Sequence, residues 1–268
     1  MFLVNGEILK DVEALASSNA FRQGDYVFTT LEYLPGKKAC FFKDHLKRLK
    51  EASIYLYSFT QEQWLEVELS LIESLTKIEE SNESRFLRLI LFLDSSQNAQ
   101  VAIHCEQYLP KSNLPLKLKS CEIENYRDRL ENFLKIPNYV LVAKELRTAK
   151  LEGFDEIVIT KSGFIMESSV SNIFFIKGKS LFTPSAQLSI LNGVARQNII
   201  KLFKSLNYEI NEKSFDIKSL DYEECFLSNS LGDIRFVKSI NQKDFDLSSD
   251  LLQKLQWEWR NYKLLSSN

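Results

Sequence analysis

The chain has 268 residues, of which 44% are hydrophobic, 12% aromatic and 26% charged, and its formal net charge is -2. These proportions are typical of a globular protein with a sizeable core, and they exclude a disordered, collagen-like or coiled-coil chain. The charge supplies no general basic field for a phosphate backbone, so we expect no nucleic-acid partner.

The first half of the sequence combines strands with amphipathic helices. Asn5-Gly6 is a two-residue hairpin signal inside the strand pattern of FLVNGEIL. The other elements expected in this half are a strand at 26–33, helices at 43–56 and 61–79, and strands at 85–93 and 101–108.

A linker is expected at LPKSNLPLK, where Pro110 and Pro115 stand among small polar residues. A chain of this length is long enough to form two domains. We therefore expect a small N-terminal α/β domain over residues 1–112 and a larger C-terminal domain over residues 113–268.

The second half alternates helices with strands, which predicts a mixed α/β (α+β) fold. Gly193 stands at the entrance of one of these helices. The expected elements are a helix at 138–152, a strand at 156–160, a turn at 161–163, a strand at 172–176, a helix at 193–206, a strand within CFLSNS and a helix at 251–264.

Several common kinds of site are missing from the sequence. Neither G-x-G-x-x-G nor a Walker A sequence occurs, which disfavours the usual nucleotide-binding loops, and no G-x-S-x-G elbow marks a hydrolase. His45 and His104 are the only histidines. One chain therefore cannot form a three-histidine metal site, and we expect no metal.

The sequence also suggests a compartment. The cysteines form no C-x-x-C pair, and we interpret them as reduced thiols: Cys40, Cys105, Cys121 and Cys225. The N-terminus has no signal-peptide pattern, and the strongest apolar run, FLRLILFL, is short and contains Arg88. We expect a cytoplasmic protein without a membrane-spanning segment.

The most informative region lies between residues 135 and 174. It holds, in order, Lys135, the pair Asn138-Tyr139, the motif GFDE and the motif ESSVSNIF, which begins at Glu167. This ordered set resembles the class IV aminotransferase superfamily, the fold-type IV pyridoxal-phosphate enzymes. Further matches at MFLVNG, GDYVFTT, DHLKRL, TPSAQLSILNGVAR and FLSNSL extend the resemblance over most of the chain.

The resemblance implies two α/β domains with pyridoxal 5'-phosphate at their junction, a homodimer and a small-molecule substrate. Lys135 would hold the cofactor covalently, because a free amine can form an imine with its carbonyl group. Lys144 and Lys150 are the rival lysines, but helical spacing after Tyr139 favours an exposed helix face for both. Glu167 would face the pyridine nitrogen and keep it protonated.

The same resemblance implies several ligands for the cofactor's phosphate. Arg48 of DHLKRL would bind it, since a planar guanidinium matches two phosphate oxygens. Val194 and Ala195 begin a helix, where free backbone N–H groups and the positive end of the helix dipole favour an anion. Ser230 would add a hydroxyl and Leu231 a backbone N–H.

Three further side chains of these motifs have expected roles of their own. Tyr139 resembles a tyrosine that contacts the phenolic oxygen of the cofactor, and a core aromatic residue is the alternative. Thr30 is the second threonine of GDYVFTT, which in the aminodeoxychorismate lyase branch of the superfamily would protonate the departing enolpyruvyl carbon, and a structural threonine of the strand is the alternative. Thr29 would point to the opposite face of the strand. His45, three residues before Arg48, we interpret as a packing residue.

GDYVFTT and SNSL favour the aminodeoxychorismate lyase branch, which implies conversion of 4-amino-4-deoxychorismate to 4-aminobenzoate and pyruvate in folate biosynthesis. The alternatives are an aminotransferase for branched-chain or D-amino acids and a binding protein that retains the fold. The last alternative rests on departures from the family pattern. Leu93 and Asp94 stand where many relatives have arginine and glycine, and Phe236 stands where relatives often have a proline before valine. Other candidates for a substrate carboxylate are Arg22, Arg88 and Arg235.

Overall fold

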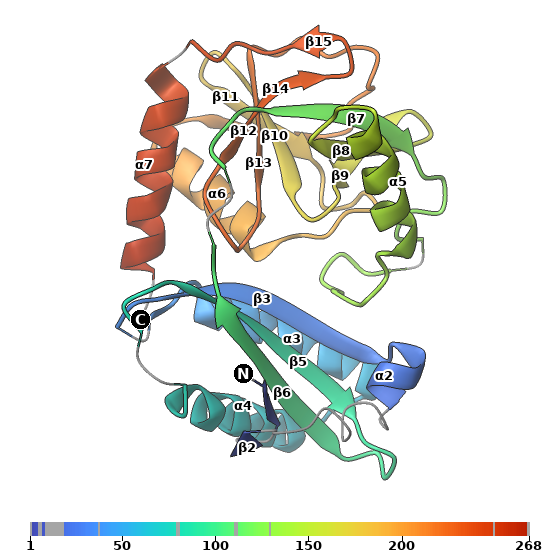
Figure 1. Ribbon diagram of the computed structural model, residues 1–268, viewed down its shortest axis with the longest axis vertical. Helices are drawn as coiled ribbons and strands as arrows, with labels where there is room; N and C mark the ends of the chain where they lie inside the picture. Colours follow the sequence, from blue (N-terminus) through green and yellow to red (C-terminus); the bar gives the residue numbers. More distant parts are fainter. Residues whose placement is uncertain are drawn as a thin grey trace. The chain divides into compact units, whose positions relative to one another are not determined.

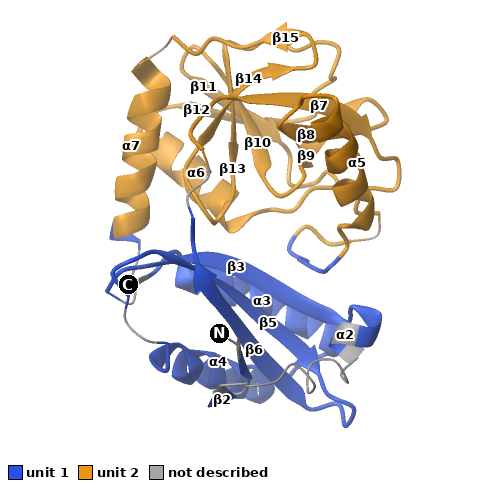
Figure 2. Ribbon diagram, viewed as in Figure 1, with its two compact units in different colours: residues 1–110, 133–137, 265–268 blue, residues 111–132, 138–264 orange. Residues whose placement is uncertain are grey.

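The computed structural model describes residues 2–4, 7–8, 19–36, 38–78, 81–109, 112–128, 130–248 and 250–266. The chain divides into two compact units, coloured separately in Figure 2. Unit 1 comprises residues 1–110, 133–137 and 265–268, and unit 2 comprises residues 111–132 and 138–264. Both units combine a sheet with helices, so the expected mixed α/β class is confirmed.

The expected division at residue 112 differs from this arrangement in two places. Residues 133–137 and 265–268 group with unit 1, although the sequence pattern placed them in the C-terminal domain. In the first segment, the carbonyl of Lys135 accepts a hydrogen bond from the backbone N–H of Phe28 at 3.0 Å. So short a segment has no compositional signal of its own, and its place in unit 1 follows from this tertiary contact.

Unit 1 is built on a six-stranded sheet with the order β2-β1-β6-β5-β3-β4. Its strands are β1 (Phe2–Val4), β2 (Glu7–Ile8), β3 (Tyr26–Leu34), β4 (Lys38–Ala39), β5 (Arg85–Leu93) and β6 (Ala99–Gln107). The long strands pair antiparallel, with Thr30 opposite Arg88 and Arg88 opposite His104. β1 and β2 pair antiparallel as well, and the residues for which a turn was expected, Asn5-Gly6, lie outside the described part of the chain.

Alternation along these strands gives the sheet of unit 1 two different faces. Leu87, Leu89 and Leu91 of β5 are fully buried, and they share one face. The helices of unit 1 are α2 (Asn19–Gln23), α3 (Phe42–Tyr57) and α4 (Gln61–Thr76). α3 packs against β3 and α4 packs against β6, as can be followed in Figure 1.

A capping box starts α4. The side chain of Thr60 accepts a hydrogen bond from the Gln63 backbone at 3.3 Å, and the Gln63 side chain accepts one from the Thr60 backbone at 2.9 Å. These two bonds satisfy N–H groups that a helix start otherwise leaves without partners. The helix ends at Thr76, three residues before the end that the sequence predicts.

Unit 2 is built on a nine-stranded sheet whose path runs β12-β11-β10-β13-β14-β7-β8-β9, with β15 paired to β14. The strands are β7 (Leu116–Glu122), β8 (Glu156–Lys161), β9 (Phe164–Ser168), β10 (Asn172–Lys177), β11 (Ser180–Pro184), β12 (Glu209–Lys213), β13 (Glu224–Ser228), β14 (Arg235–Ile240) and β15 (Lys243–Asp244). The helices are α5 (Val140–Leu151), α6 (Val194–Ser205) and α7 (Asp250–Leu265).

The sheet of unit 2 is curled. β9 ends the strand path whereas β10 lies inside it, yet only residues 169–171 join these two strands. The backbone N–H of Ser168 donates to the carbonyl of Ser171 at 2.8 Å, which closes the connecting turn. The two strands can be joined this tightly only if the sheet bends back on itself.

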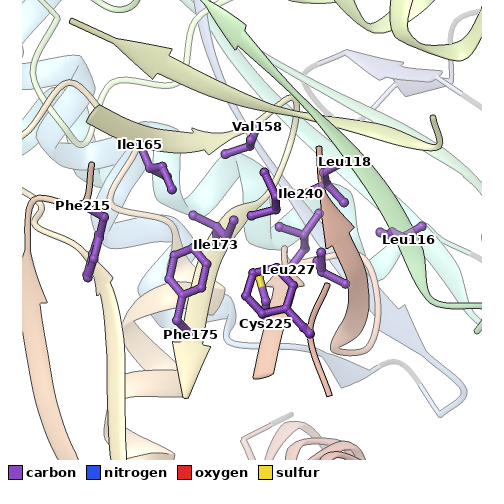
Figure 3. Packing of buried hydrophobic residues seen from close by; sticks show 12 residues of the cluster. Leu116, Leu118, Val158, Ile165, Ile173, Phe175, Phe215, Cys225, Leu227 and Ile240 are labelled. Atoms are coloured by element: carbon purple, nitrogen blue, oxygen red, sulfur yellow. The ribbon is translucent and has the colours of Figure 1, made fainter. Parts of the chain in front are cut away.

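Alternate residues of the unit 2 strands belong to two faces. Ile173 and Leu227 lie in the inner cluster of apolar side chains, which Figure 3 shows. Phe174 and Phe226 point to the other face, where their rings stack with centroids 4.9 Å apart. The ring of Phe203, on α6, lies 6.0 Å from that of Phe226. This packing holds α6 against the strands β10 and β13.

Six strands of unit 2 were not predicted, namely β7, β9, β11, β12, β14 and β15. β7 begins one residue after Pro115, inside the expected linker, and β12 is the polar stretch EINEK at the end of the sheet path.

The four cysteines are buried and form no disulfide bond. Across the described residues, no helix is long and apolar enough to cross a membrane.

Candidate functional site

Lys135 belongs to unit 1, where its segment is held by the hydrogen bond from Phe28 of β3. The amine Nζ lies 5.2 Å from the centroid of the Phe28 ring. The guanidinium carbon of Arg88 lies 4.7 Å from the centroid of the same ring. A cation near an aromatic face is attracted by the ring quadrupole, so Phe28 helps to position both cationic groups.

Thr29, the residue after Phe28, faces the helix side of the sheet and is fully buried. Its hydroxyl lies 2.5 Å from His45 Nδ1 and accepts a hydrogen bond from Arg48 Nη2. Burial lowers the pKa of His45 well below 6.5, and the positive charges of Arg48 and Lys135 lower it further. A neutral imidazole can accept the Thr29 proton at Nδ1, so Thr29 links His45 to Arg48. His45 is therefore a buried packing and hydrogen-bonding residue, and Arg48 is buried beside it.

Thr30 projects from the opposite face of β3 and is half-buried. Phe28 projects from the same face as Thr30, because the two residues are two positions apart. Arg88 stands directly opposite Thr30 in the antiparallel pair. Among the described residues, the Nε of Arg88 is buried and has no hydrogen-bond partner. Unit 1 thus places an amine and a guanidinium beside one aromatic ring, and the Thr30 hydroxyl is on the same face of β3.

The rival lysines, the candidate Arg22 and the departure Asp94 can be placed as well. Lys144 and Lys150 are exposed on α5, which agrees with the surface positions expected for them. Arg22 is exposed on α2. Asp94 caps the turn after β5, where its carboxylate accepts hydrogen bonds from the backbone N–H groups of Ser96 at 2.8 Å and Asn98 at 2.9 Å. Asp94 therefore stabilises the turn between β5 and β6.

Glu167 lies near the end of β9 in unit 2 and is only 5% exposed. Its Oε1 accepts hydrogen bonds from the Tyr126 hydroxyl and the Leu191 backbone N–H, both at 2.9 Å. Its Oε2 accepts one from Asn172 Nδ2 at 3.0 Å. Donors on both oxygens stabilise the ionised form of a buried carboxylate and hold its plane in one orientation.

Asn172, the first residue of β10, joins Glu167 to the loop before α6. Its Nδ2 also donates to the carbonyl of Leu191 at 2.8 Å. A β-carbon at Gly193 would stand 2.4 Å from Asn172 Oδ1, so glycine is required there by close approach. The φ of Gly193 is -61°, which any residue can adopt. The requirement is therefore steric.

Val194 and Ala195 are the first residues of α6, and both are buried. The preceding Gly193 is the N-cap and supplies no side-chain oxygen to the first turn. The positive end of the helix dipole and the N–H groups of this turn suit an anion. Arg196 belongs to the structure of the loop, since its guanidinium bonds Asn192 Oδ1 at 2.9 Å and the Pro184 carbonyl at 2.8 Å.

Ser230 and Leu231 follow β13 and are half-buried. Asn229 ties this loop to the β9–β10 turn, because its Nδ2 donates to Ser171 Oγ at 3.0 Å. The backbone N–H of Leu231 donates to Asn229 Oδ1 at 2.9 Å. The N–H that the sequence assigned to a phosphate thus takes part in an internal hydrogen bond. Tyr139 is half-buried and is the N-cap residue of α5.

The sequence analysis missed several residues of this arrangement. Nothing in the spacing marked Tyr126 as a partner of Glu167, and the backbone N–H of Leu191 cannot be read from a side-chain pattern. Asn172 stood inside the recognised motif, but its contacts with Glu167 and Gly193 follow only from the curl of the sheet. Thr29 was expected to point away from Thr30, and it does.

Each unit offers its own set of chemical groups. Unit 1 has an amine, two guanidinium groups and the Thr30 hydroxyl, whereas unit 2 has a fixed carboxylate and an uncapped helix start. An amine suits a carbonyl carbon, a carboxylate suits a protonated ring nitrogen, and guanidinium and helix N–H groups suit a phosphate. Within the described residues, no cluster of three or more histidine, cysteine or acidic side chains could hold a metal ion.

Comparison with known proteins gives matches of three kinds. The sequence model of the family described as amino-transferase class IV matches residues 26–240. A probable branched-chain-amino-acid aminotransferase of Rickettsia felis is 31% identical over 105 residues, which cover 38% of this chain and 36% of that protein. The aminodeoxychorismate lyase of Bacillus subtilis is 25% identical over 253 residues, which cover 87% of this chain and 84% of that protein.

Among solved structures, a hypothetical aminotransferase from Mycobacterium tuberculosis in a PLP-bound form superposes with a TM-score of 0.81. The sequence identity is 17%, and the match covers 99% of both chains. The chain thus spans about a third of the length of the Rickettsia relative that it matches, but most of the length of the Bacillus protein and of the Mycobacterium structure.

Proposed function

Since the chain belongs to the class IV aminotransferase family, we propose that it is a pyridoxal-phosphate-dependent enzyme, and more specifically a 4-amino-4-deoxychorismate lyase. The similarity to the Bacillus subtilis lyase over 87% of the chain supports the specific reaction. The observation that carries it is the placement of Thr30, whose hydroxyl shares a face of β3 with Phe28, the ring beside the Lys135 amine.

The residues present fit pyridoxal phosphate. Lys135 would bind its aldehyde carbon, and Glu167, whose carboxylate has donors on both oxygens, would accept the hydrogen bond of its ring nitrogen. Arg48 and the first N–H groups of α6, at Val194 and Ala195, would bind its phosphate. When bound, the cofactor supplies an electron sink for negative charge that develops on the substrate.

The remaining cofactor contacts are proposed with the roles that the sequence analysis gives them. Ser230 would donate its hydroxyl to the phosphate, and Tyr139 would contact the phenolic oxygen. Leu231 would reach the phosphate through its N–H only if that group exchanged its present bond to Asn229. Its contribution is therefore expected to be the smallest of the three.

The lyase reaction needs one carbon–oxygen bond to break and one proton to move. The ether bond between the ring and the enolpyruvyl group breaks, the ring loses a proton to become aromatic, and the enolpyruvyl methylene gains a proton to give pyruvate. Lys135, once freed from its covalent link, would accept the ring proton, and Thr30 would deliver a proton to the methylene carbon. No other reactant is required.

The substrate is an anion with two carboxylates, and Arg88 is the described group best placed to bind one of them. It stands opposite Thr30, and its Nε is buried without a hydrogen-bond partner among the described residues. A guanidinium pairs with a carboxylate through two parallel hydrogen bonds. Arg88 would thus bind the carboxylate that many relatives bind with the arginine of an arginine-glycine pair, where this chain has Leu93 and Asp94.

A branched-chain or D-amino-acid aminotransferase is the second candidate, and the 31% identity to the Rickettsia felis protein favours it. It would use the same lysine but would also need an acceptor keto acid. A binding protein that retains the fold is the third. The homodimer and the cytoplasmic location expected from the sequence stay predictions.

The test is incubation of the purified, cofactor-loaded protein with 4-amino-4-deoxychorismate in the absence of any keto acid. Equal amounts of 4-aminobenzoate and pyruvate support the lyase. Transfer of an amino group from a branched-chain or D-amino acid to 2-oxoglutarate, without those products, supports the aminotransferase. Absence of both activities in a protein that binds pyridoxal phosphate leaves the binding protein.

A further inference from the structure

In the sequence, Tyr126 follows β7 by four residues, and the proposed reaction gives it no role. Its ring packs against the apolar cluster that includes Val142 of α5 and Met166 of β9. Its backbone N–H donates to the carbonyl of Ile123 at 3.0 Å, which holds the residue in a turn. Ring and backbone are both fixed, and the hydroxyl reaches Glu167 Oε1 at 2.9 Å.

Burial, followed by the charge of Glu167, raises the pKa of Tyr126 well above 10. The phenol therefore keeps its proton and acts as a hydrogen-bond donor throughout the neutral range. Hydrogen bonds from a fixed donor to a carboxylate are among the stronger ones in proteins. The contact with Tyr126 thus favours the ionised form of Glu167.

The other donors to this carboxylate are fixed as well. Leu191 N–H shares Oε1 with Tyr126, and Asn172 Nδ2 binds Oε2. Bonds to both oxygens determine the plane of the carboxylate, whereas a carboxylate bonded on one side only can turn about its last torsion. Groups that orient a ligand-binding carboxylate in this way affect affinity although they do not touch the ligand.

We propose that Tyr126 is a positioning residue, which holds the Glu167 carboxylate in the orientation that accepts the ring N–H of the cofactor. The inference rests on the proposed function for the identity of the ligand. Its structural part, the coupling of Tyr126 to Glu167, can be tested without any cofactor.

The first experiment measures amide hydrogen exchange of Leu191 in cofactor-free protein for the wild type, Y126F, E167Q and the double variant. We expect Y126F to speed exchange by about tenfold, and the double variant to exchange no faster than E167Q, because the two groups act through one contact. Tyr208→Phe is the matched control. Tyr208 is a half-buried tyrosine of unit 2 that packs on Phe203, so its loss should leave Leu191 unchanged.

The second experiment uses pyridoxal phosphate labelled with nitrogen-15 in its ring. In Y126F we expect about tenfold weaker cofactor binding and a ring-nitrogen chemical shift displaced toward that of unprotonated pyridine, whereas Y208F should match the wild type. A purely structural role of Tyr126 would change stability without moving that shift.

The outcomes separate the two claims. Unchanged Leu191 exchange in Y126F, or effects of Y126F and E167Q that add fully, overturn the coupling. A wild-type shift and affinity in Y126F overturn the positioning role. A wild-type protein that binds no pyridoxal phosphate overturns the proposed function, and the exchange cycle then still decides whether Tyr126 holds Glu167.

Discussion

The side-chain oxygen of Asn172 occupies the space that a β-carbon on Gly193 would need, with only 2.4 Å between the two positions. The same side chain donates to Glu167 and to the Leu191 carbonyl. One asparagine thus joins the carboxylate on β9 to the start of α6, and the glycine allows the two to approach this closely.

Gly193→Ala should therefore destabilise unit 2 by about 1–3 kcal/mol, because the new methyl group displaces Asn172 and breaks hydrogen bonds of buried groups. Urea unfolding of the variant measures this cost. In the background of Asn172→Ala, which removes the obstructing oxygen, Gly193→Ala should cost much less. Equal costs in the two backgrounds would show that the contact with Asn172 is not the cause.

The same substitution should lower stability at Thr29 and activity at Thr30. Thr29→Val removes the buried hydroxyl that joins His45 to Arg48, so we expect a loss of about 1–3 kcal/mol in stability. Thr30→Val should change stability little but lower the rate of pyruvate release by about 10²- to 10⁴-fold, which is the usual loss of rate when a general acid is removed. Unfolding curves and product assays on both variants decide. A Thr30→Val enzyme with wild-type turnover contradicts the proposed role.

The stability of unit 1 should fall as the pH drops below about 6.5, the ordinary pKa of histidine. Burial, Arg48 and Lys135 lower the pKa of His45 in the folded protein, so the unfolded chain binds a proton that the folded chain does not. The stabilisation is present above the unfolded pKa and is lost at up to about 1.4 kcal/mol per pH unit below it.

His45→Asn should flatten this pH dependence when unfolding is measured between about pH 7 and pH 5. The pKa of His104 is also lowered, mainly by partial burial, although Glu106 opposes the shift. His104→Asn should accordingly remove a smaller part of the slope. A slope that is identical in the wild type and in His45→Asn would exclude His45 as its source.

Arg88→Gln should raise the KM for 4-amino-4-deoxychorismate by about 10- to 100-fold, since a lost carboxylate contact weakens binding of this anion. Arg22→Gln is the control, because Arg22 is exposed on α2. Steady-state kinetics of the two variants provide the comparison. An unchanged KM in Arg88→Gln would assign the substrate carboxylate to another residue.

The sequence predicted elements well where one periodic pattern filled a whole segment. The strand at Arg85–Leu93 was predicted with the observed bounds, and α3 and α7 lie within one or two residues of their expected ends. The strands β7 and β12 were missed because proline-linker and polar signals outweighed weak alternation in LKLKSCE and EINEK. Pairing with neighbours in the sheet makes these segments strands.

The candidate site divides in the same way. Motif spacing predicted roles for Lys135, Glu167 and the start of α6, because each lies in a continuous signature. Tyr126 lies 41 positions from Glu167 in the sequence, and only the folded chain brings its hydroxyl to the carboxylate. The sequence likewise placed the segment around Lys135 in the C-terminal domain, whereas it groups with unit 1, since a backbone bond to Phe28 leaves no trace in the sequence.

The most direct test of the account is to locate the lysine that binds the cofactor. The protein is loaded with pyridoxal phosphate, reduced with borohydride and digested, and the modified peptide is identified by mass spectrometry. We predict modification at Lys135, with loss of both the label and the visible cofactor absorbance in Lys135→Ala but not in Lys144→Ala, which changes an exposed lysine of α5. Label on another lysine, or an unchanged spectrum in Lys135→Ala, would contradict the account.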